Sequence, residues 1–380
     1  MSALSEVNLK QGLRKLEYPL CAKEALNKIV ELICGRITSI KNMDLALDLM
    51  AEFIFCEVDR RGHKKQQALS PLLELQLIEI FHNFFNSIQS ETARNTVFLS
   101  LFSGTTVTIR LGILSRLVSV AVGLPSPTIL TSTSVWMQQL GNTSPNSCKL
   151  TECLIQDYFY YYQNSTERLK ALPSICPQFV ANFLTAVSEN YFNVNRKQLL
   201  FPPNILLETI TSWIAENSNL CIAAQLKQAV LPPGAIAMEA ITPIAGLLRW
   251  CILAPIYKQT DEIYAQLHLA LLNSIIDSPG RTPCKVVYVY APHLSAVNYP
   301  ILGYVQELKN RHDLKLDQIL HENTLQLSLD RYAQAIQVLT SANAVHGHVD
   351  DLFYQLKMLP FNKLMKIVID NYKQSKVIVL

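Results

Sequence analysis

The segment that decides the fold is Pro71–Ile88, which reads PLLELQLIEIFHNFFNSI. Its large apolar residues recur at intervals of three and four, so they gather on one face of a helix. Polar residues fill the opposite arc. Because the apolar face covers more than half of the circumference, we expect this helix to touch neighbours on two sides, as in stacked helical pairs. The apolar face consists of Leu73, Leu77, Ile80, Phe81, Phe84 and Ile88, widened by Ile78 and Phe85.

The same spacing continues along the chain and is again clear near Ser328–Ala342. It predicts about fourteen to sixteen helices separated by short breaks, most of which are marked by proline. No repeat of fixed period is present. We therefore expect an all-α fold, an irregular α-solenoid of stacked helical hairpins with the architecture of HEAT or armadillo arrays and no substantial sheet.

The composition supports a packed helical chain. Of the 380 residues, 49% are hydrophobic and only 17% are charged, which provides a core and too little charge for disorder. The formal net charge of +3 creates no field that would draw the whole protein onto a polyanion or an anionic membrane. We expect no membrane partner and no direct contact with nucleic acid, unless a local cluster provides one.

The nine cysteines are scattered, odd in number and without a Cys-x-x-Cys pair, as in reduced intracellular proteins. Cys148 and Cys153 are the closest pair, but no second Cys/His pair follows at zinc-finger spacing. The N-terminal residues 1–11 lack the apolar core of a secretory signal. Arg110 and Arg116 interrupt the most apolar stretch, so we expect a core helix there rather than a membrane span.

The longest polar stretch, Gly141–Ser147, is the best candidate boundary between two helical-repeat halves. These halves are residues 1–140 and 148–380, although one continuous solenoid is also compatible with the sequence. Lys285–Tyr290 alone has the composition of a β-strand. A single strand cannot form a sheet, and no partner strand is evident, so tertiary context is expected to make the segment helical.

Catalytic signatures are absent: the chain has no phosphate-binding loop, dinucleotide fingerprint, nucleophile elbow or zinc-protease motif. We expect no enzymatic activity, no cofactor, no metal and no small-molecule substrate. His346 and His348 form the only close histidine pair and are interpreted as loop residues at a helix end, in preference to metal ligands.

A basic cluster, Arg60, Arg61, Lys64 and Lys65, connects two expected helices. It is interpreted as a solvated loop; contacts to phosphates or a nuclear-import signal are the functional alternatives. The aromatic run 158–162 is more unusual. Helical spacing turns Tyr158 and Tyr161 inward and Phe159 and Tyr160 outward, where they either anchor a partner or lie beneath a further layer of the chain. Together with two leucines outside the main face of 71–88, the partner-binding candidates are Phe159, Tyr160, Leu72 and Leu75.

Six apolar blocks, in the same order and approximate spacing, resemble the Integrator complex subunit 15 family over about residues 20 to 370. The blocks are Leu69–Ile80, Phe98–Phe102, Glu208–Ile214, Thr242–Cys251, Tyr264–Leu269 and Leu327–Val338. The chain departs from the family pattern in two places. It ends in Lys373–Leu380 where vertebrate members have a long Pro/His-rich tail, and Val286–Tyr299 fits poorly.

The resemblance implies a nuclear helical-repeat subunit without catalysis of its own. Its partners would be other Integrator subunits, whose modules it would connect within an RNA polymerase II-associated assembly for snRNA 3′-end processing and transcription attenuation. The alternative, from a different class of function, is a helical-repeat adaptor that binds nucleic acid through the loop from Arg60 to Lys65.

Overall fold

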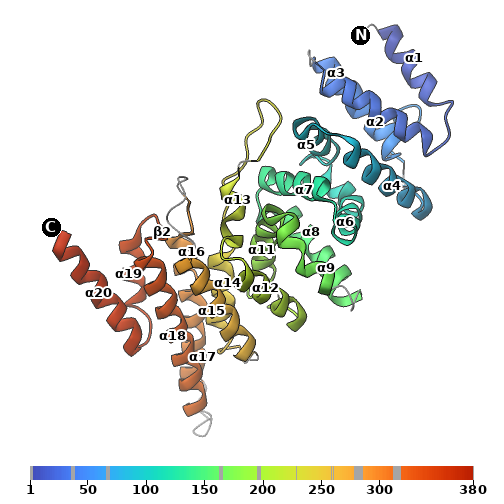
Figure 1. Ribbon diagram of the computed structural model, residues 1–380. Coiled ribbons are helices and arrows are strands. Elements are labelled where there is room, and N and C mark those ends of the chain that lie inside the picture. The colour runs from blue at the N-terminus through green and yellow to red at the C-terminus, as the bar shows by residue number, and fades with distance from the viewer. Residues whose placement is uncertain are drawn as a thin grey trace. The chain divides into compact units, whose positions relative to one another are not determined.

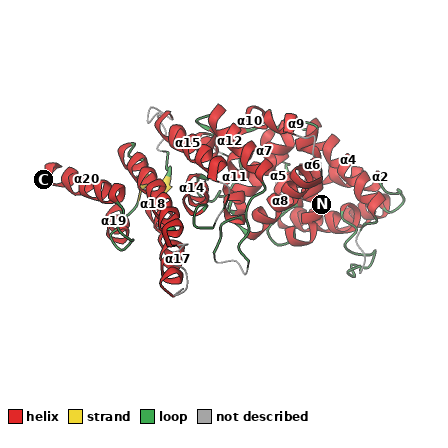
Figure 2. Cartoon of the chain, turned by 90° about the horizontal axis from the view of Figure 1, so that it is seen from below, coloured by secondary structure: helices red, strands yellow, loops and turns green. Residues whose placement is uncertain are grey.

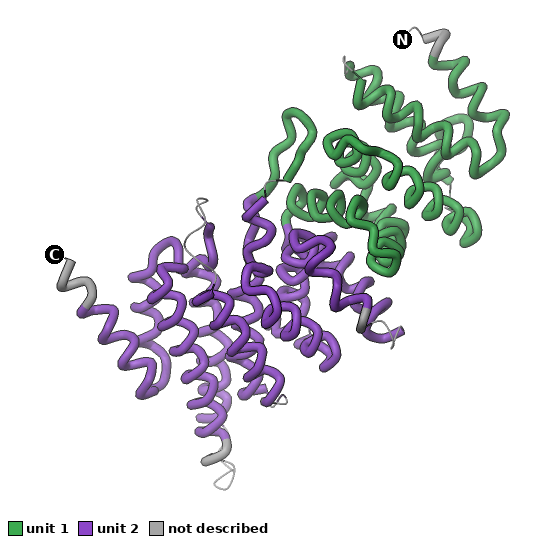
Figure 3. Tube along the Cα trace, viewed as in Figure 1, with its two compact units in different colours: residues 1–141, 229–238 green, residues 142–228, 239–380 purple. Residues whose placement is uncertain are grey.

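The computed structural model describes residues 3–35, 39–65, 69–161, 166–194, 198–227, 229–257, 259, 261–277, 286–310 and 318–379. Helices dominate throughout (Figure 2), which confirms the predicted all-α, helical-repeat fold. Two compact units are present (Figure 3). The first comprises Met1–Gly141 and Ala229–Met238, and the second comprises Asn142–Gln228 and Glu239–Leu380.

The first unit contains seven α-helices and a π-helical turn among its described residues (Figure 1). Alternate helices form two layers, because α4 packs beside α6 and α5 packs beside α7. The bounds are α1 (Ala3–Leu13), α2 (Leu20–Ile33), α3 (Ile40–Leu49), η1 (Met50–Ile54), α4 (Pro71–Ser87), α5 (Glu91–Leu101), α6 (Val107–Gly123) and α7 (Pro127–Leu140).

Helix α4 forms where the apolar periodicity predicts it. Ser70 caps its N-terminus by accepting a hydrogen bond from the backbone N–H of Leu73, and Pro71 occupies the first turn, where a missing N–H costs nothing. The buried arc is displaced from the centre of the predicted apolar face toward Ile78 and Phe85, and the remaining residues of that face are half-buried. The fully buried side chains are Leu77, Ile78, Phe81 and Phe85.

Aromatic rings fill the core of the first unit. Phe55, Phe81, Phe85, Phe98 and Phe102 contact one another with centroids 5.2–6.1 Å apart. The Arg110 guanidinium lies 4.0 Å from the centroid of Phe55 and pairs with the Glu57 carboxylate at 2.7 Å. Arg110 therefore brings its charge into the core together with a counter-ion, which is the condition for burying an arginine.

The segment Ala229–Met238 belongs to the first unit although the chain on either side of it belongs to the second. We call it the strap. The buried Asn95 side chain donates a 2.7 Å hydrogen bond to the carbonyl of Val230, and the N–H of Met238 donates to the carbonyl of Gln138 at 3.0 Å. These contacts attach both ends of the strap to α5 and α7.

The helices of the second unit form two neighbouring rows. In one row α8 packs against α11, α11 against α14, and α14 against α18. In the other row α9 packs against α12, and α12 packs against α15. The helices are α8 (Pro145–Ile155), α9 (Thr166–Lys170), α10 (Leu172–Ile175), α11 (Pro177–Asn190), α12 (Asn204–Glu216), α13 (Ala223–Leu226), α14 (Ile244–Leu253), α15 (Asp261–Asp277), α16 (Ala291–Ser295), α17 (Asn298–Asn310), α18 (Gln318–Ser341), α19 (Val349–Leu356) and α20 (Lys363–Val379), with the short turns η2 (Gln156–Tyr161) and η3 (Leu220–Ile222).

Helices α11 and α14 approach each other closely in the second unit. Both helices are buried along most of their length. A Cβ atom at Gly246 would overlap the Ser188 side chain, so the two backbones approach more closely than a larger residue permits. The Trp250 indole N–H donates to the carbonyl of Tyr191 at 3.1 Å, which satisfies the polar atom of a fully buried ring.

The prediction that no strand partners Lys285–Tyr290 is wrong for its described end. Val289–Tyr290 (β1) pairs in parallel with Val345–His346 (β2), and His348 lies just beyond β2 at the N-cap of α19. Lys285 lies outside the described residues. Just before β1 in the chain, the side-chain amide of Gln225 takes the place of a neighbouring strand. Its oxygen accepts a hydrogen bond from the N–H of Val287 at 2.9 Å, and its nitrogen donates to the carbonyl of Val287 at 2.8 Å. A side chain thus supplies the hydrogen bonds that a sheet would otherwise provide.

All cysteines in the described ranges are free thiols. No helix among those residues is long and apolar enough to span a bilayer.

Candidate functional site

Two of the predicted partner-binding residues, Leu72 and Leu75, lie in the first turn of α4 and remain largely exposed. The core face of α4 is on the other side of the helix, so burying that face leaves these leucines in solvent. They give the first unit an exposed apolar surface of the kind that a partner can cover.

Helix α6 extends this surface. Its Arg116 pairs with Glu74, which sits next to Leu75 on α4. Ile109 lies two turns before Arg116 on the same side of α6 and is also exposed. The sequence did not lead us to Ile109, because its helix is apolar on every side. The sequence signal for the exposure of Ile109 is Arg116. It follows seven positions later on the same face of the helix, and its charge marks that face as the one that points to solvent.

The basic cluster lies on a tight hairpin rather than on an irregular loop. Val58 and Lys64 form an antiparallel bridge, and Gly62 adopts a positive φ of 83° at the tip. The Asp59 carboxylate accepts hydrogen bonds from the backbone N–H groups of His63 and Arg61 at 2.9 and 2.8 Å. Both hydrogen bonds lower the pKa of Asp59, and the one from the N–H of His63 has the larger effect. The cationic side chains all point to solvent: they are Arg60, Arg61, Lys64 and Lys65.

The base of this hairpin is fastened to the core of its unit. Glu57 pairs with the buried Arg110, and the Arg14 guanidinium donates to the carbonyl of Arg60 at 3.2 Å while also pairing with Glu52. The cations are therefore held on a fixed backbone. Such an arrangement can attract anions, and the aromatic ring within residues 57–65 is the exposed imidazole of His63, which lies 3.3 Å from the Asp59 carboxylate.

The other two predicted residues, Phe159 and Tyr160, lie in η2, a π-helical turn that continues α8. Tyr160 is 56% exposed, as expected for an outward position. Phe159 is only 7% exposed, so it does not face solvent and, of the two alternatives, coverage by the chain itself holds for this ring. Tyr161, placed inward by regular spacing, is 76% exposed. Tyr162 lies outside the described residues.

The π-helical geometry explains both side-chain positions. Hydrogen bonds from residue i to i+5 insert an extra residue into the turn, so the side chains that follow rotate away from the face that α-helical spacing assigns them. Local sequence contains no direct sign of this change. Two adjacent tyrosines, Tyr160 and Tyr161, therefore form the exposed aromatic pair of the second unit.

A groove of about 740 Å³ adjoins the strap in the first unit. Its walls come from the end of α2, the start of α3, the start of α5 and the strap residues Pro232 and Pro233. Ile33, Ile40 and Met43 supply apolar surface, and Ser90, Thr92 and Thr96 supply hydroxyls. No sequence pattern indicated this groove, since it forms only when the strap returns to the first unit.

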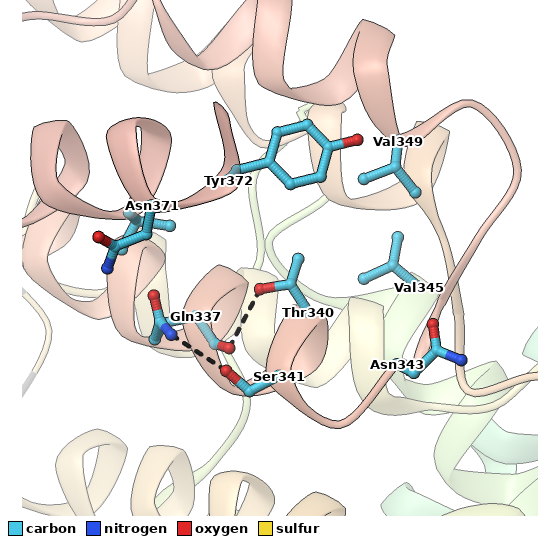
Figure 4. Close-up of a pocket in the computed structure, with 9 residues that line it drawn as sticks. Gln337, Thr340, Ser341, Asn343, Val345, Val349, Asn371 and Tyr372 are labelled. Atoms are coloured by element: carbon cyan, nitrogen blue, oxygen red, sulfur yellow. Dashed lines mark hydrogen bonds between the residues drawn. The ribbon is translucent and has the colours of Figure 1, made fainter. Parts of the chain in front are cut away.

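A pocket of about 460 Å³ in the second unit is bounded by α18, β2, α19 and α20 (Figure 4). Gln337, Thr340 and Tyr372 contribute amide and hydroxyl groups to its lining, and among the described residues none of the lining side chains is a carboxylate, histidine or amine. His346 and His348 lie nearby in sequence but outside this lining. No group of three or more potential metal ligands occurs in the described ranges.

Comparison with known proteins gives the family. The model of the family described as Integrator complex subunit 15 matches residues 7–361. The chain belongs to the Integrator complex subunit 15 family. It is 35% identical to the Drosophila melanogaster protein of that name over 96% of this chain and 97% of the relative. The Homo sapiens and Mus musculus proteins are 29% and 30% identical, each over 87% of this chain and 78% of the relative.

The extent of the match confirms the resemblance that the six apolar blocks indicate. The basic hairpin, α4, α6 and η2 all lie within the residues matched by the family model. Helix α20 begins at Lys363, beyond the last matched residue.

Proposed function

We propose that this chain is a non-catalytic scaffold subunit of an Integrator complex, located in the nucleus, where it connects other subunits. The observation that carries the proposal is the family match over residues 7–361. In this proposal the complex acts with RNA polymerase II in snRNA 3′-end processing and transcription attenuation, and this chain contributes binding surface rather than chemistry.

The architecture supports such a role. Stacked helices present long faces whose outward side chains can be apolar without disturbing the core. In the first unit Leu72 and Leu75 on α4 and Ile109 on α6 are exposed apolar residues, and the Glu74–Arg116 ion pair links the two helices. In the second unit Tyr160 and Tyr161 are exposed side by side. Aromatic and large apolar anchors dominate the energy of protein–protein contacts, so these residues are the proposed partner-binding positions.

The test is affinity purification of the tagged chain from nuclear extract treated with nuclease. The other Integrator subunits are expected at near-stoichiometric levels, and the chain purified alone is expected to show no nuclease, phosphatase or nucleotide-hydrolysis activity. Recovery of an unrelated assembly, or of none, would contradict the proposal. Loss of the subunits only after nuclease treatment would show that nucleic acid bridges them and would favour the adaptor that binds through Arg60–Lys65.

A further inference from the structure

The corner between α19 and α20 displays three large apolar side chains in a short stretch of chain. Tyr354, Met358 and Phe361 are 62%, 61% and 74% exposed. Tyr354 lies in the last turn of α19, Met358 in the turn that follows the helix, and Phe361 immediately after Pro360. Exposed aromatic and methionine side chains gathered in this way are typical of surfaces that another molecule covers.

The corner is rigid rather than a loose turn. The Asn362 side chain is buried and donates to Gln326 at 2.8 Å and to Asp330 at 2.7 Å, both on α18. Its oxygen accepts from the N–H of Met365 at 2.8 Å and thereby caps α20. Gln326 also donates to the carbonyl of Phe361 at 3.0 Å. The backbone is therefore fixed in the conformation that holds Phe361 in solvent, which reduces the entropy lost on binding.

Positive charge surrounds these apolar side chains. Lys357 ends α19, and Lys363 and Lys366 lie in the first turns of α20; all three are exposed. None of them forms an ion pair within the described part of the chain. The first turn of α20 contains no acidic residue, so the positive end of the helix dipole adds to the lysines instead of being neutralised.

Three of the neighbouring carboxylates are already engaged, whereas Asp351 in the first turn of α19 is exposed. Asp330 accepts from Asn362, Asp370 pairs with Lys373 at 3.0 Å, and Asp350 accepts from the Tyr372 hydroxyl at 3.1 Å. The lysines of the corner thus lack an acidic partner from these nearby groups. A bound molecule with its own carboxylates would supply one.

We infer that this corner, defined by Tyr354, Met358, Phe361, Lys357, Lys363 and Lys366, docks an acidic amphipathic helix of a partner protein. The apolar face of that helix would cover Tyr354, Met358 and Phe361, and carboxylates at its margin would meet the lysines. A nucleic acid would complement only the charged part of this surface, because its phosphates would pair with the lysines while the apolar side chains stayed exposed to solvent. The inference deepens the proposed scaffold role by naming the chemistry of one partner segment.

Peptide binding to the purified full-length chain tests the inference without the rest of the complex. The probe is a fluorescein-labelled synthetic helix with Leu and Phe on one face and Glu on the other. Two comparison peptides carry Lys in place of Glu, or the same residues in an order that abolishes the apolar face. By fluorescence anisotropy at roughly 0.1 M salt, we expect the acidic helix to bind about tenfold more tightly than either comparison peptide.

The variants separate the two components of the surface. M358A with F361A should weaken binding of the acidic helix by about tenfold or more, since the apolar anchors are lost. K357E with K363E and K366E should reverse the preference, so that the Lys peptide binds better than the Glu peptide. The matched control K23E with K41E and K227E removes three exposed lysines elsewhere and should leave the preference unchanged. Circular dichroism of each variant verifies that it remains folded.

Equal binding of the acidic, basic and shuffled peptides would overturn the inference. It would also be overturned if a duplex RNA displaced the acidic peptide while M358A with F361A had no effect, because the corner would then be a polyanion site. These outcomes are independent of co-purification with Integrator subunits. Failure of the peptide test and failure of the proposed function are therefore distinguishable.

Discussion

Phe159 and Tyr160 are consecutive residues with opposite environments. The phenyl ring is buried in the second unit, whereas the tyrosine ring is largely exposed. The π-helical turn that contains them determines this division, because it changes which side chains face the core. A functional role for the aromatic run therefore rests on Tyr160 and Tyr161, and Phe159 contributes to stability.

Single substitutions separate these roles. Phe159→Ala should destabilise the protein by about 2 to 4 kcal/mol and lower its melting temperature by several degrees, because a buried ring is lost and a cavity remains. Tyr160→Ala should change stability by less than about 0.5 kcal/mol. Thermal unfolding followed by circular dichroism measures both. A melting temperature that falls equally in the two variants would mean that Tyr160 also packs in the core.

His268, on α15, is a buried titratable residue that the proposed function does not use. Its burial, followed by the positive charge of Arg331, lowers its pKa to about 4. Arg331 in turn donates to the carbonyl of Cys251 on α14 at 2.9 Å. The neutral imidazole is thus the form that the folded protein accommodates.

A pH-dependent stability follows. The unfolded chain binds a proton at His268 below about pH 6.5, and the folded chain does so only below about pH 4, so stability falls as pH decreases through this interval. His268 can account for up to about 3 kcal/mol of that loss. Denaturant unfolding at several pH values should show a weaker dependence for His268→Gln than for the wild type. The exposed His348→Gln serves as the control and should retain the wild-type dependence.

At the scale of elements, several irregular segments are held by side-chain amides. Gln225 satisfies both backbone groups of Val287, and Asn362 fixes the α19–α20 corner. Asn95 does the same for the strap: it donates to Val230 while accepting from the Ser132 hydroxyl at 2.7 Å. A buried amide suits this purpose because it donates and accepts at once.

Removal of the Asn95 amide should release the strap. Asn95→Ala leaves the Val230 carbonyl and the Ser132 hydroxyl without these hydrogen bonds, at a cost of about 1 to 3 kcal/mol. Limited proteolysis should therefore cut within residues 229–238 faster in this variant than in the wild type. Asn83→Ala, at an exposed position on α4, is the matched control. Unchanged cleavage in Asn95→Ala would show that other contacts hold the strap.

At the scale of the whole molecule, the chain combines an extensive helical surface with little charge. Only 17% of its residues are charged, and the net charge is +3. The exposed apolar residues occur in both units, and the basic hairpin and the α19–α20 corner are two local groups among the exposed cations. Binding to the rest of a complex is therefore expected to depend mainly on apolar contact, with electrostatics acting at particular positions.

This distribution predicts a salt-resistant association. Raising the salt from roughly 0.15 to 0.5 M screens exposed charges but not apolar contact, so co-purified Integrator subunits should remain bound. They should also remain with R60E, R61E, K64E and K65E combined. Quantitative mass spectrometry of the purified complex provides the measurement. Dissociation by salt, or by the hairpin substitutions, would show instead that the basic hairpin provides the main binding surface.

The sequence by itself determined the helical class, the core face of α4 and the family. Each depends on a pattern that extends over many residues: apolar positions at three- and four-residue spacing, prolines at helix starts, and six apolar blocks in order. It also indicated that Leu72 and Leu75 lie outside the main apolar face of their helix, and the structure leaves both exposed.

Only the tertiary structure decided the remaining features. β1 finds its partner in a segment that follows α18, and the strap rejoins the first unit after six described helices of the second unit, α8 to α13. The α19–α20 corner likewise depends on Asn362 reaching α18. These contacts join residues far apart in the chain, and local periodicity contains no information about which distant group will satisfy a given backbone or side-chain hydrogen bond.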